Sequence, residues 1–106
     1  MERGDIVEFV PARGARGREQ RGKRFGVVLQ ADELLALSTV VVAPTSTRAL
    51  AASFRPTISV RGRRTKLLLE QLTAVDVTRL GRPVGALSRR ELDEVDEGVK
   101  LVLGLR

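Results

Sequence analysis

The last part of the chain carries the pattern that most constrains the fold, an amphipathic helix with a defined start. Ser88 followed three residues later by Glu91 has the spacing of a capping box, in which each side chain accepts a hydrogen bond from the other residue's backbone amide. The apolar residues that follow recur at spacings of three and four and form one face: Leu92, Val95, Val99 and Val102. Such a helix needs an apolar surface to pack on, which the preceding residues must supply.

Short runs rich in β-branched residues, bounded by proline or glycine, precede this helix and predict that surface. We expect strands at residues 6–10, 25–30, 39–43, 57–60, 66–71 and 84–86. Pro11 and Pro44 are expected to end two of them, because proline lacks the backbone donor of a ladder. Residues 31–37 predict a short helical turn and 61–64 a basic turn, whereas 48–54 fits either helix or loop. The pattern therefore predicts a β-rich α+β fold, a strongly bent sheet or partly open barrel with the C-terminal helix packed on it.

The composition limits both the core and the chemistry. Hydrophobic residues make up 42% of the 106 residues but aromatic residues only 3%, so Val, Leu, Ile and Ala must build the core of what we expect to be one domain, residues 1–106. The absence of Cys and His excludes disulfides and removes the commonest metal ligands and general base, and we expect no metal or other cofactor. No apolar run approaches the roughly 20 residues that span a bilayer, and no secretory signal is evident, so a cytoplasmic protein with no membrane contact is expected.

Positive charge is concentrated in the N-terminal body of the chain. The net charge is +6, and residues 88–106 carry four Lys and Arg against five Asp and Glu, which leaves +7 on residues 1–87. A field of this sign favours a phosphate backbone or an acidic protein partner. The charge supplies affinity and does not by itself select a sequence.

Two segments are candidates for a phosphate site. Residues 11–24 hold six basic residues and three glycines, which predicts an exposed loop able to hold a polyanion. Pro44 is followed by three hydroxyl residues, Thr45, Ser46 and Thr47, which can present small donors to a phosphate. Taken alone, the basic residues also fit a solvated loop, and the hydroxyls fit a turn in which they bond backbone groups.

Five motifs resemble the MazF/PemK toxins in order and spacing, over nearly the whole chain. They are Met1 to Ile6, the loop Gly17 to Arg24 leading into Val27 and Val28, the Val-Ala-Pro-x-hydroxyl corner at 42–46, Leu69-Glu70-Gln71, and the helix with Glu94-Val95-Asp96. The resemblance implies an SH3-like barrel, the fold shared with CcdB. It also implies a homodimer that cuts single-stranded RNA at short sequences without metal, under the control of an acidic, MazE-like antitoxin.

The resemblance also implies roles for individual residues. The arginine that ends the loop, Arg24, corresponds to the family's catalytic arginine, and Ser46 corresponds to its hydroxyl partner, usually Thr. The family's Gly-Ser-Glu-Gln loop corresponds to Gly17-Arg18-Glu19-Gln20, so the RNA-binding candidates are Arg18, Glu19, Gln20, Arg21, Thr45 and Thr47. Phe25 stands where the family usually has proline, which leaves Arg24 less rigidly held, and serine lacks the methyl that fixes a threonine rotamer.

RNA cleavage of this kind requires few catalytic groups from the protein. RNA carries its own nucleophile, the 2′-hydroxyl, so the protein has to align it and offset charge on the phosphoryl oxygens. The Arg24 guanidinium can donate to two oxygens and the Ser46 hydroxyl to a third. The general base stays open between Glu19, Ser46 and water, since an arginine stays charged. The expected products are a 2′,3′-cyclic phosphate and a 5′-hydroxyl end.

Two other functions fit parts of the sequence. A CcdB-like poison of DNA gyrase depends on a Trp-Gly-Ile ending, whereas this chain ends Leu103-Gly104-Leu105-Arg106 and contains no Trp. A non-catalytic module that binds RNA or the ribosome is the stronger alternative, with Phe25 and Ser46 as inactivating changes. Substoichiometric turnover of RNA distinguishes an enzyme from such a binder.

Overall fold

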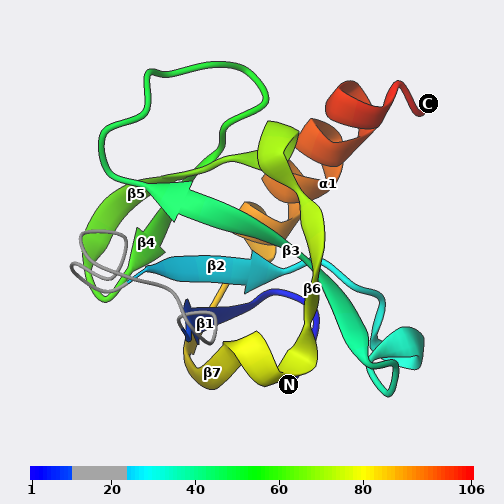
Figure 1. Cartoon of the computed structure of the whole chain (residues 1–106). Helices are drawn as coiled ribbons and strands as arrows, with labels where there is room; N and C mark the ends of the chain where they lie inside the picture. Colours follow the sequence, from blue (N-terminus) through cyan, green and yellow to red (C-terminus); the bar gives the residue numbers. More distant parts are fainter. Residues whose placement is uncertain (11–23) are drawn as a thin grey trace.

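The computed structural model describes residues 1–10 and 24–106 (Figure 1). Within them lie seven strands: β1 Asp5–Phe9, β2 Phe25–Val28, β3 Thr39–Ser46, β4 Thr57–Val60, β5 Arg63–Leu67, β6 Thr73–Asp76 and β7 Leu80–Ala86. Three short 3-10 turns connect strands: η2 Asp32–Leu34, η3 Leu69–Gln71 and η4 Val77–Arg79. The helix α1 Arg89–Leu103 follows the last strand, β7.

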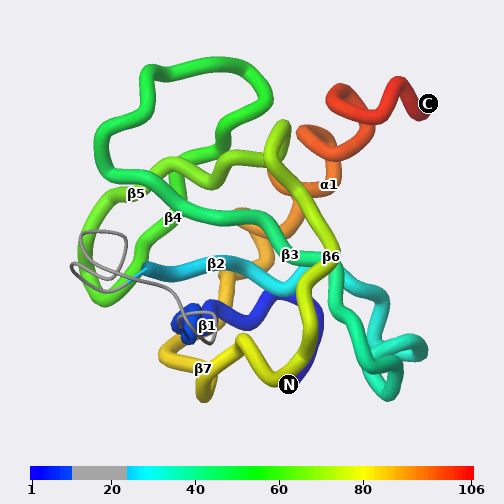
Figure 2. Tube along the Cα trace, in the orientation of Figure 1, coloured from blue at the N-terminus to red at the C-terminus, as the bar shows by residue number. Residues whose placement is uncertain are grey.

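The strands form one curled antiparallel sheet. Their order is β4-β5-β3-β2-β1-β7, and β6 pairs with the free side of the first half of β3. The long strand β3 pairs with β6 through Thr39 to Val42 and with β5 through Thr45 and Ser46, so its two halves belong to different parts of the sheet. Figure 2 shows the resulting curl, with the loop between β3 and β4 standing away from it. The partly open barrel predicted from the sequence is confirmed.

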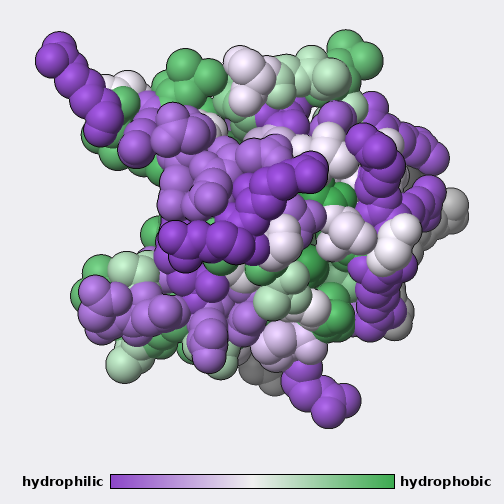
Figure 3. Space-filling view, turned by 180° about the vertical axis from the view of Figure 1, so that it is seen from behind, coloured by the Kyte–Doolittle hydropathy of each residue, from purple (hydrophilic) through white to green (hydrophobic). Residues whose placement is uncertain are grey.

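The predicted helix is confirmed together with its cap. The Ser88 hydroxyl accepts from the Glu91 amide at 3.1 Å, and the Glu91 carboxylate accepts from the Ser88 amide at 2.8 Å. Gly104 ends the helix in the left-handed conformation with φ of 70°. Ion pairs along its solvent side, such as Arg90 with Glu94, agree with the largely hydrophilic surface seen from behind in Figure 3. The acidic residues of α1 thus have structural partners, within the helix for Glu94 and outside it for Asp96, which pairs with Arg3 at 2.9 Å.

Apolar residues fill both faces of the sheet. Neighbours such as Val27 and Val28, or Val42 and Ala43, belong to different clusters because side chains alternate along a strand. The larger cluster lies between the sheet and α1 and contains Ile6, Val27, Ala43, Ile58, Val60, Leu67, Leu69, Leu87 and Val95. The smaller cluster, on the other face, contains Val7, Val28, Val40 and Val42. The expectation of a core built from Val, Leu, Ile and Ala is confirmed.

Several predicted boundaries are wrong, mostly because pairing partners outweigh local signals. Pro44 does not end its strand: β3 continues to Ser46, with Pro44 opposite Gly26 and its carbonyl accepting from the Leu68 amide at 2.9 Å. The strand expected at 66–71 is β5, which ends at Leu67 before the turn η3, and β7 begins at 80 instead of 84. The strand β6 was not predicted, and 48–54 contains neither helix nor strand.

The loop between β3 and β4 is tied to η3 by one ion pair. The Arg55 guanidinium donates to the Glu70 carboxylate, with Nε at 2.9 Å from Oε2, and it also donates to the Leu50 carbonyl at 3.0 Å. Hydrogen bonding from Arg55 lowers the pKa of Glu70 below its ordinary value. Glu70, part of the Leu69-Glu70-Gln71 motif, thus has a defined structural partner.

In the described part of the chain, no helix is both long enough and apolar enough to cross a membrane.

The Arg55 and Glu70 pair predicts a pH-dependent contribution to stability. A carboxyl whose pKa is lowered on folding stabilises the fold above its unfolded pKa of about 4.3 and loses that contribution as pH falls through the lower folded value. We therefore expect Glu70→Gln to lower the free energy of unfolding at pH 7 and to have little effect below about pH 3, measured by urea unfolding. Exposed Glu33→Gln is the control, and an equal effect at both pH values would contradict the prediction.

Replacing Gly98 of α1 by alanine should have the reverse of the usual effect on stability. Replacing an interior helical glycine by alanine ordinarily stabilises a helix by about 1 kcal/mol. At Gly98, however, a Cβ would collide with the Leu69 side chain of η3. We expect Gly98→Ala to destabilise the protein by roughly 1–2 kcal/mol in chemical unfolding. Combining it with Leu69→Ala, which empties that space, should remove the penalty, and purely additive effects would refute the collision.

Candidate nucleic-acid interface

Ser46 lies at the end of β3, where its hydroxyl forms the turn into the following loop. Its Oγ accepts from the amides of Arg48 and Ala49, each at 3.1 Å. This is the turn role that the sequence left as an alternative. A hydroxyl has one proton to donate besides its lone pairs, so both acceptor bonds leave the Ser46 proton able to point outward. The structural role therefore orients the hydroxyl as a donor and does not exclude a second partner.

The strand register brings Arg24 toward Ser46. Gly26 pairs with Pro44 and Val27 with Ala43, and the same register continued outward aligns Arg24 with Ser46. The Thr45 hydroxyl donates to the Phe25 carbonyl at 3.0 Å, which ties the two strands together beyond their last ladder pair. Arg24 is exposed, and its carbonyl accepts from the Phe9 amide at 2.8 Å. No other described residue forms a hydrogen bond or ion pair with its guanidinium.

Lys66 extends this arrangement on the other side of Ser46. It pairs directly with Ser46 on β3 and with Thr57 on β4, and its ammonium donates to the Thr57 hydroxyl at 2.6 Å. Side chains of directly paired residues lie on the same face of an antiparallel sheet. Ser46, Lys66 and Thr57 thus form one line across β3, β5 and β4, and Arg24, which immediately precedes β2, falls on the same line when the β2–β3 register is continued; we call these four residues the cross-strand row.

The sequence did not identify Lys66 as a site residue and placed it only at the start of the strand expected at 66–71. The available signal was the alternation in Arg63–Leu67, where Thr65 and Leu67 are buried and Lys66 between them must face the other way. Its alignment with Ser46 depends on which strand β5 joins, and a local pattern does not contain that information. The ammonium has three donors, and one is used on Thr57. Within the described residues Lys66 has no carboxylate partner.

The other two hydroxyls of the corner lie differently. Thr45 uses its proton on the Phe25 carbonyl, so it has none left for a phosphate. Thr47 is exposed and, with Phe25, Thr45, Ser46, Val60, Arg63 and Thr65, lines a small cleft of about 170 Å³. Of the three hydroxyls, Ser46 alone belongs to the cross-strand row. Thr47 stays a predicted RNA-binding residue, whereas the hydroxyl proton of Thr45 is already used.

The predicted RNA-binding residues Arg18, Glu19, Gln20 and Arg21 lie outside the described residues, as does most of the basic loop.

Gly26 and Phe25 determine which side chains pack on the two faces of β2. An ideal Cβ at Gly26 would lie 2.5 Å from the ring of Phe9, so only glycine lets that ring cross the strand. Phe25 points to the opposite side, where the Arg61 guanidinium lies over its ring at 5.5 Å from the centroid. The residue that replaces the family's usual proline is thus held by a cation–π contact.

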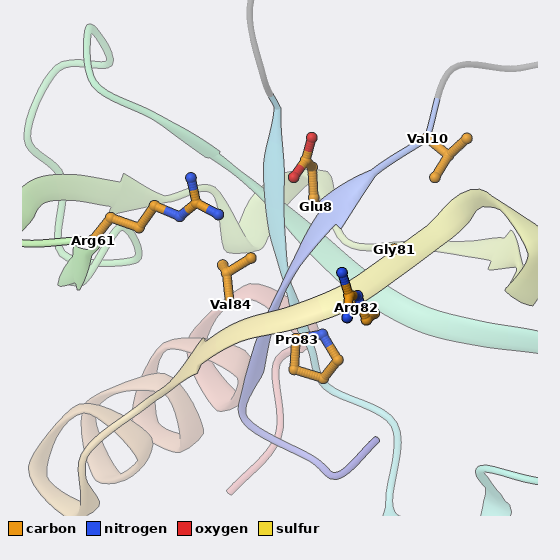
Figure 4. A pocket seen from close by; sticks show the side chains of 7 residues that line it. All are labelled: Glu8, Val10, Arg61, Gly81, Arg82, Pro83 and Val84. Atoms are coloured by element: carbon orange, nitrogen blue, oxygen red, sulfur yellow. The ribbon is translucent and has the colours of Figure 1, made fainter.

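A second and larger hollow opens beside Arg61. It has a volume of about 510 Å³ and is lined by Glu8, Val10, Arg61, Gly81, Arg82, Pro83 and Val84. In Figure 4, the Arg61 side chain extends from the hairpin between β4 and β5 toward Glu8 on β1, and Val84 lies between them. The hollow therefore combines one carboxylate with two guanidinium groups above an apolar wall.

The chain is similar to known proteins over nearly its full length. It is 39% identical to the toxin Rv3098A of Mycobacterium tuberculosis, over 93% of this chain and 92% of that one. It is 35% identical to the endoribonuclease MazF9 of the same organism, over 99% and 98% of the two chains. Both relatives are similar enough in sequence to indicate shared ancestry.

Solved structures agree on the fold. An endoribonuclease from a mycobacterial species, solved in complex with its cognate antitoxin, has a TM-score of 0.81 at 11% identity and covers 100% of this chain and 97% of that one. A MazE–MazF structure from Deinococcus radiodurans has a TM-score of 0.79 at 18% identity, with coverages of 100% and 97%. The model of one family matches residues 2–103, and this chain therefore belongs to the PemK-like, MazF-like toxins of type II toxin–antitoxin systems.

Proposed function

We propose that the protein is an endoribonuclease that cuts single-stranded RNA at short sequences and acts as an mRNA interferase toxin. Membership of the toxin family and the naming of a 35% identical relative as an endoribonuclease support this activity. The observation that carries the proposal is the cross-strand row, in which the Ser46 hydroxyl lies between the cations Arg24 and Lys66. The whole chain, 1–106, is then one toxin domain that acts on cytoplasmic RNA.

The row assigns a separate task to each side chain. The Arg24 guanidinium donates in a fork to two oxygens of the scissile phosphate, and the Ser46 proton, directed outward by the two amides on Oγ, donates to the same group. These donors stabilise the charge that builds on the phosphoryl oxygens as the RNA 2′-hydroxyl attacks. The attack forms a 2′,3′-cyclic phosphate, and the 5′-oxygen leaves as a hydroxyl. None of these steps requires a metal.

Lys66 takes the next phosphate along the strand. Adjacent strands of a sheet lie about 4.8 Å apart, so Lys66 is one strand beyond Ser46 and two beyond Arg24. Consecutive phosphates of an extended RNA strand are farther apart than one strand spacing, and the four-carbon stem of lysine spans the difference. Thr57 holds the ammonium while two of its protons remain for RNA oxygens.

The basic surface is also suited to an acidic antitoxin and a second copy of the chain. Solved relatives include an endoribonuclease with its cognate antitoxin and a MazE–MazF complex. With +7 of formal charge on residues 1–87, this protein would attract a MazE-like acidic segment to the surface that attracts RNA. We propose a homodimer in which antitoxin and RNA compete for that surface.

Cleavage in the presence of a chelator tests the proposed reaction. Wild-type protein, at substoichiometric concentration in excess EDTA, should fragment a long unstructured RNA and leave cyclic phosphate ends. Removing one preorganised donor costs about 10²–10³ in rate, so we expect losses of that size for Arg24→Ala and for Ser46→Ala. DNA of the same sequence should resist cleavage.

Arg106→Ala, in the exposed C-terminal residue, is the control for Arg24→Ala and should keep wild-type activity. Intact RNA that is bound by folded wild-type protein would instead support the non-catalytic binding module. Inhibition of DNA gyrase without RNA cleavage would support the CcdB-like poison.

The salt dependence of RNA binding tests Lys66. Each neutralised phosphate of a single strand contributes about −0.7 to the slope of log affinity against log salt concentration. Lys66→Met keeps the aliphatic stem and removes the charge, so the slope for an RNA with 2′-fluoro sugars should become shallower by about 0.7. Lys100→Met on α1 is the matched control. Equal slopes for the two variants would remove Lys66 from the proposed site.

A further inference from the structure

The hollow beside Arg61 contains none of the residues proposed for cleavage, but it lies close to the small cleft that Ser46 lines. Phe25 lines the small cleft together with Ser46, and Arg61 lies over the Phe25 ring while lining the larger hollow. The two spaces are therefore linked by the contact between Arg61, which lines the hollow, and Phe25, which lines the cleft and follows Arg24 in the sequence. We propose that this hollow, with Glu8 and Arg61, is a subsite that reads a guanine base of the RNA next to the cut. The inference deepens the proposed function and rests on it.

Arg61 has a backbone conformation that arginine rarely adopts. It has φ of 52°, and the following Gly62 has φ of 78°, so these two residues form the tight turn between β4 and β5. Asn, Asp or Gly are the residues that adopt this first position at low cost. The turn therefore does not require arginine, and strained residues of this kind concentrate at functional sites. Its side chain is directed by the contact with Phe25 into the hollow (Figure 4).

Glu8 supplies the opposite chemistry on the neighbouring wall. It pairs with Phe25 across β1 and β2, so its side chain lies on the same face of the sheet as that ring. It is half-buried, and no described residue forms a hydrogen bond or ion pair with its carboxylate, although Arg61 and Arg82 line the same hollow. A carboxylate with no partner among the described residues has acceptor oxygens available for a ligand in the hollow.

These groups together suit a base better than a phosphate. A phosphate would use the guanidinium groups but leave the Glu8 carboxylate facing a like charge, whereas a carboxylate accepts well from a ring with two adjacent N–H donors. Guanine has that pair in N1–H and the 2-amino group, and its O6 and N7 are the acceptors that arginine binds in a fork. Uracil and adenine lack the adjacent donors. Val84 and Pro83 provide an apolar wall for the ring, and about 510 Å³ is ample for a base and its sugar.

Binding selection with an uncleavable RNA pool tests the subsite separately from catalysis. A randomised pool with 2′-fluoro sugars lacks the nucleophile, so it reports recognition even if no RNA is ever cut. Selection on the full-length wild-type protein should enrich guanosine at one position, and Glu8→Gln should reduce that enrichment at least tenfold. Exposed Glu33→Gln is the matched control and should keep it. No guanosine enrichment by wild type, or equal enrichment by Glu8→Gln, would overturn the proposal.

Inosine identifies the atom that is read. Replacing the selected guanosine by inosine removes only the 2-amino group, which should weaken binding about tenfold to wild type and leave Glu8→Gln unaffected, measured by fluorescence anisotropy. An inosine penalty of the same size in both proteins would refute the contact with Glu8. Cleavage of unmodified RNA is assayed in parallel, so loss of the enzyme activity and loss of the subsite are separate results.

Arg61→Asn separates the turn from the recognition. Asn adopts positive φ more readily than arginine, so the variant should unfold at the wild-type temperature or above it while losing guanosine enrichment. Retained enrichment in this stably folded variant would exclude Arg61 from the subsite.

Discussion

The pairing of β3 on both sides is the constraint on which the rest of the structure depends. It pairs with β6 through Thr39 to Val42, with β2 through Val42 to Pro44 and with β5 through Thr45 and Ser46, so this one strand joins all parts of the curled sheet. Because β3 continues through Pro44, Ser46 lies beyond the proline as the last residue of the strand. Without that continuation, Arg24 and Lys66 would have no common neighbour.

Local patterns in the sequence predicted most of the helices and strands but not which strands pair with each other. The helix from Arg89 was identified with its cap, because Ser88 and Glu91 satisfy each other within one turn. Most strands were located by their β-branched residues, with errors at their ends. The passage of β3 through Pro44 and the existence of β6 depend on pairing between distant segments, and propensity does not record which strand lies beside which.

The same distinction applies to the candidate site. Arg24 and Ser46 were predicted through a family resemblance, and the register of β2 and β3, continued beyond its last pair, is consistent with their lying opposite each other. Lys66 was missed because its relevance comes only from lying opposite Ser46 on β5. The two interpretations of Ser46 proved compatible: accepting two amide bonds in the turn is what leaves its proton directed outward. A structural explanation of a hydroxyl is therefore no argument against a chemical one.

Phe25 lies between the proposed cleavage residues and the hollow beside Arg61. It is also the residue that stands where the family usually has proline. A proline at this position would fix the backbone after Arg24 but would offer no large ring on the side facing Arg61. The phenyl ring instead takes the Arg61 guanidinium, and it lies opposite Glu8 and beside the cleft that Ser46 lines. The side-chain contact thus positions the Arg61 guanidinium, which lines the hollow proposed for the base. Under the proposed function, the substitution is therefore explained as a change of specificity and not as the loss of an enzyme.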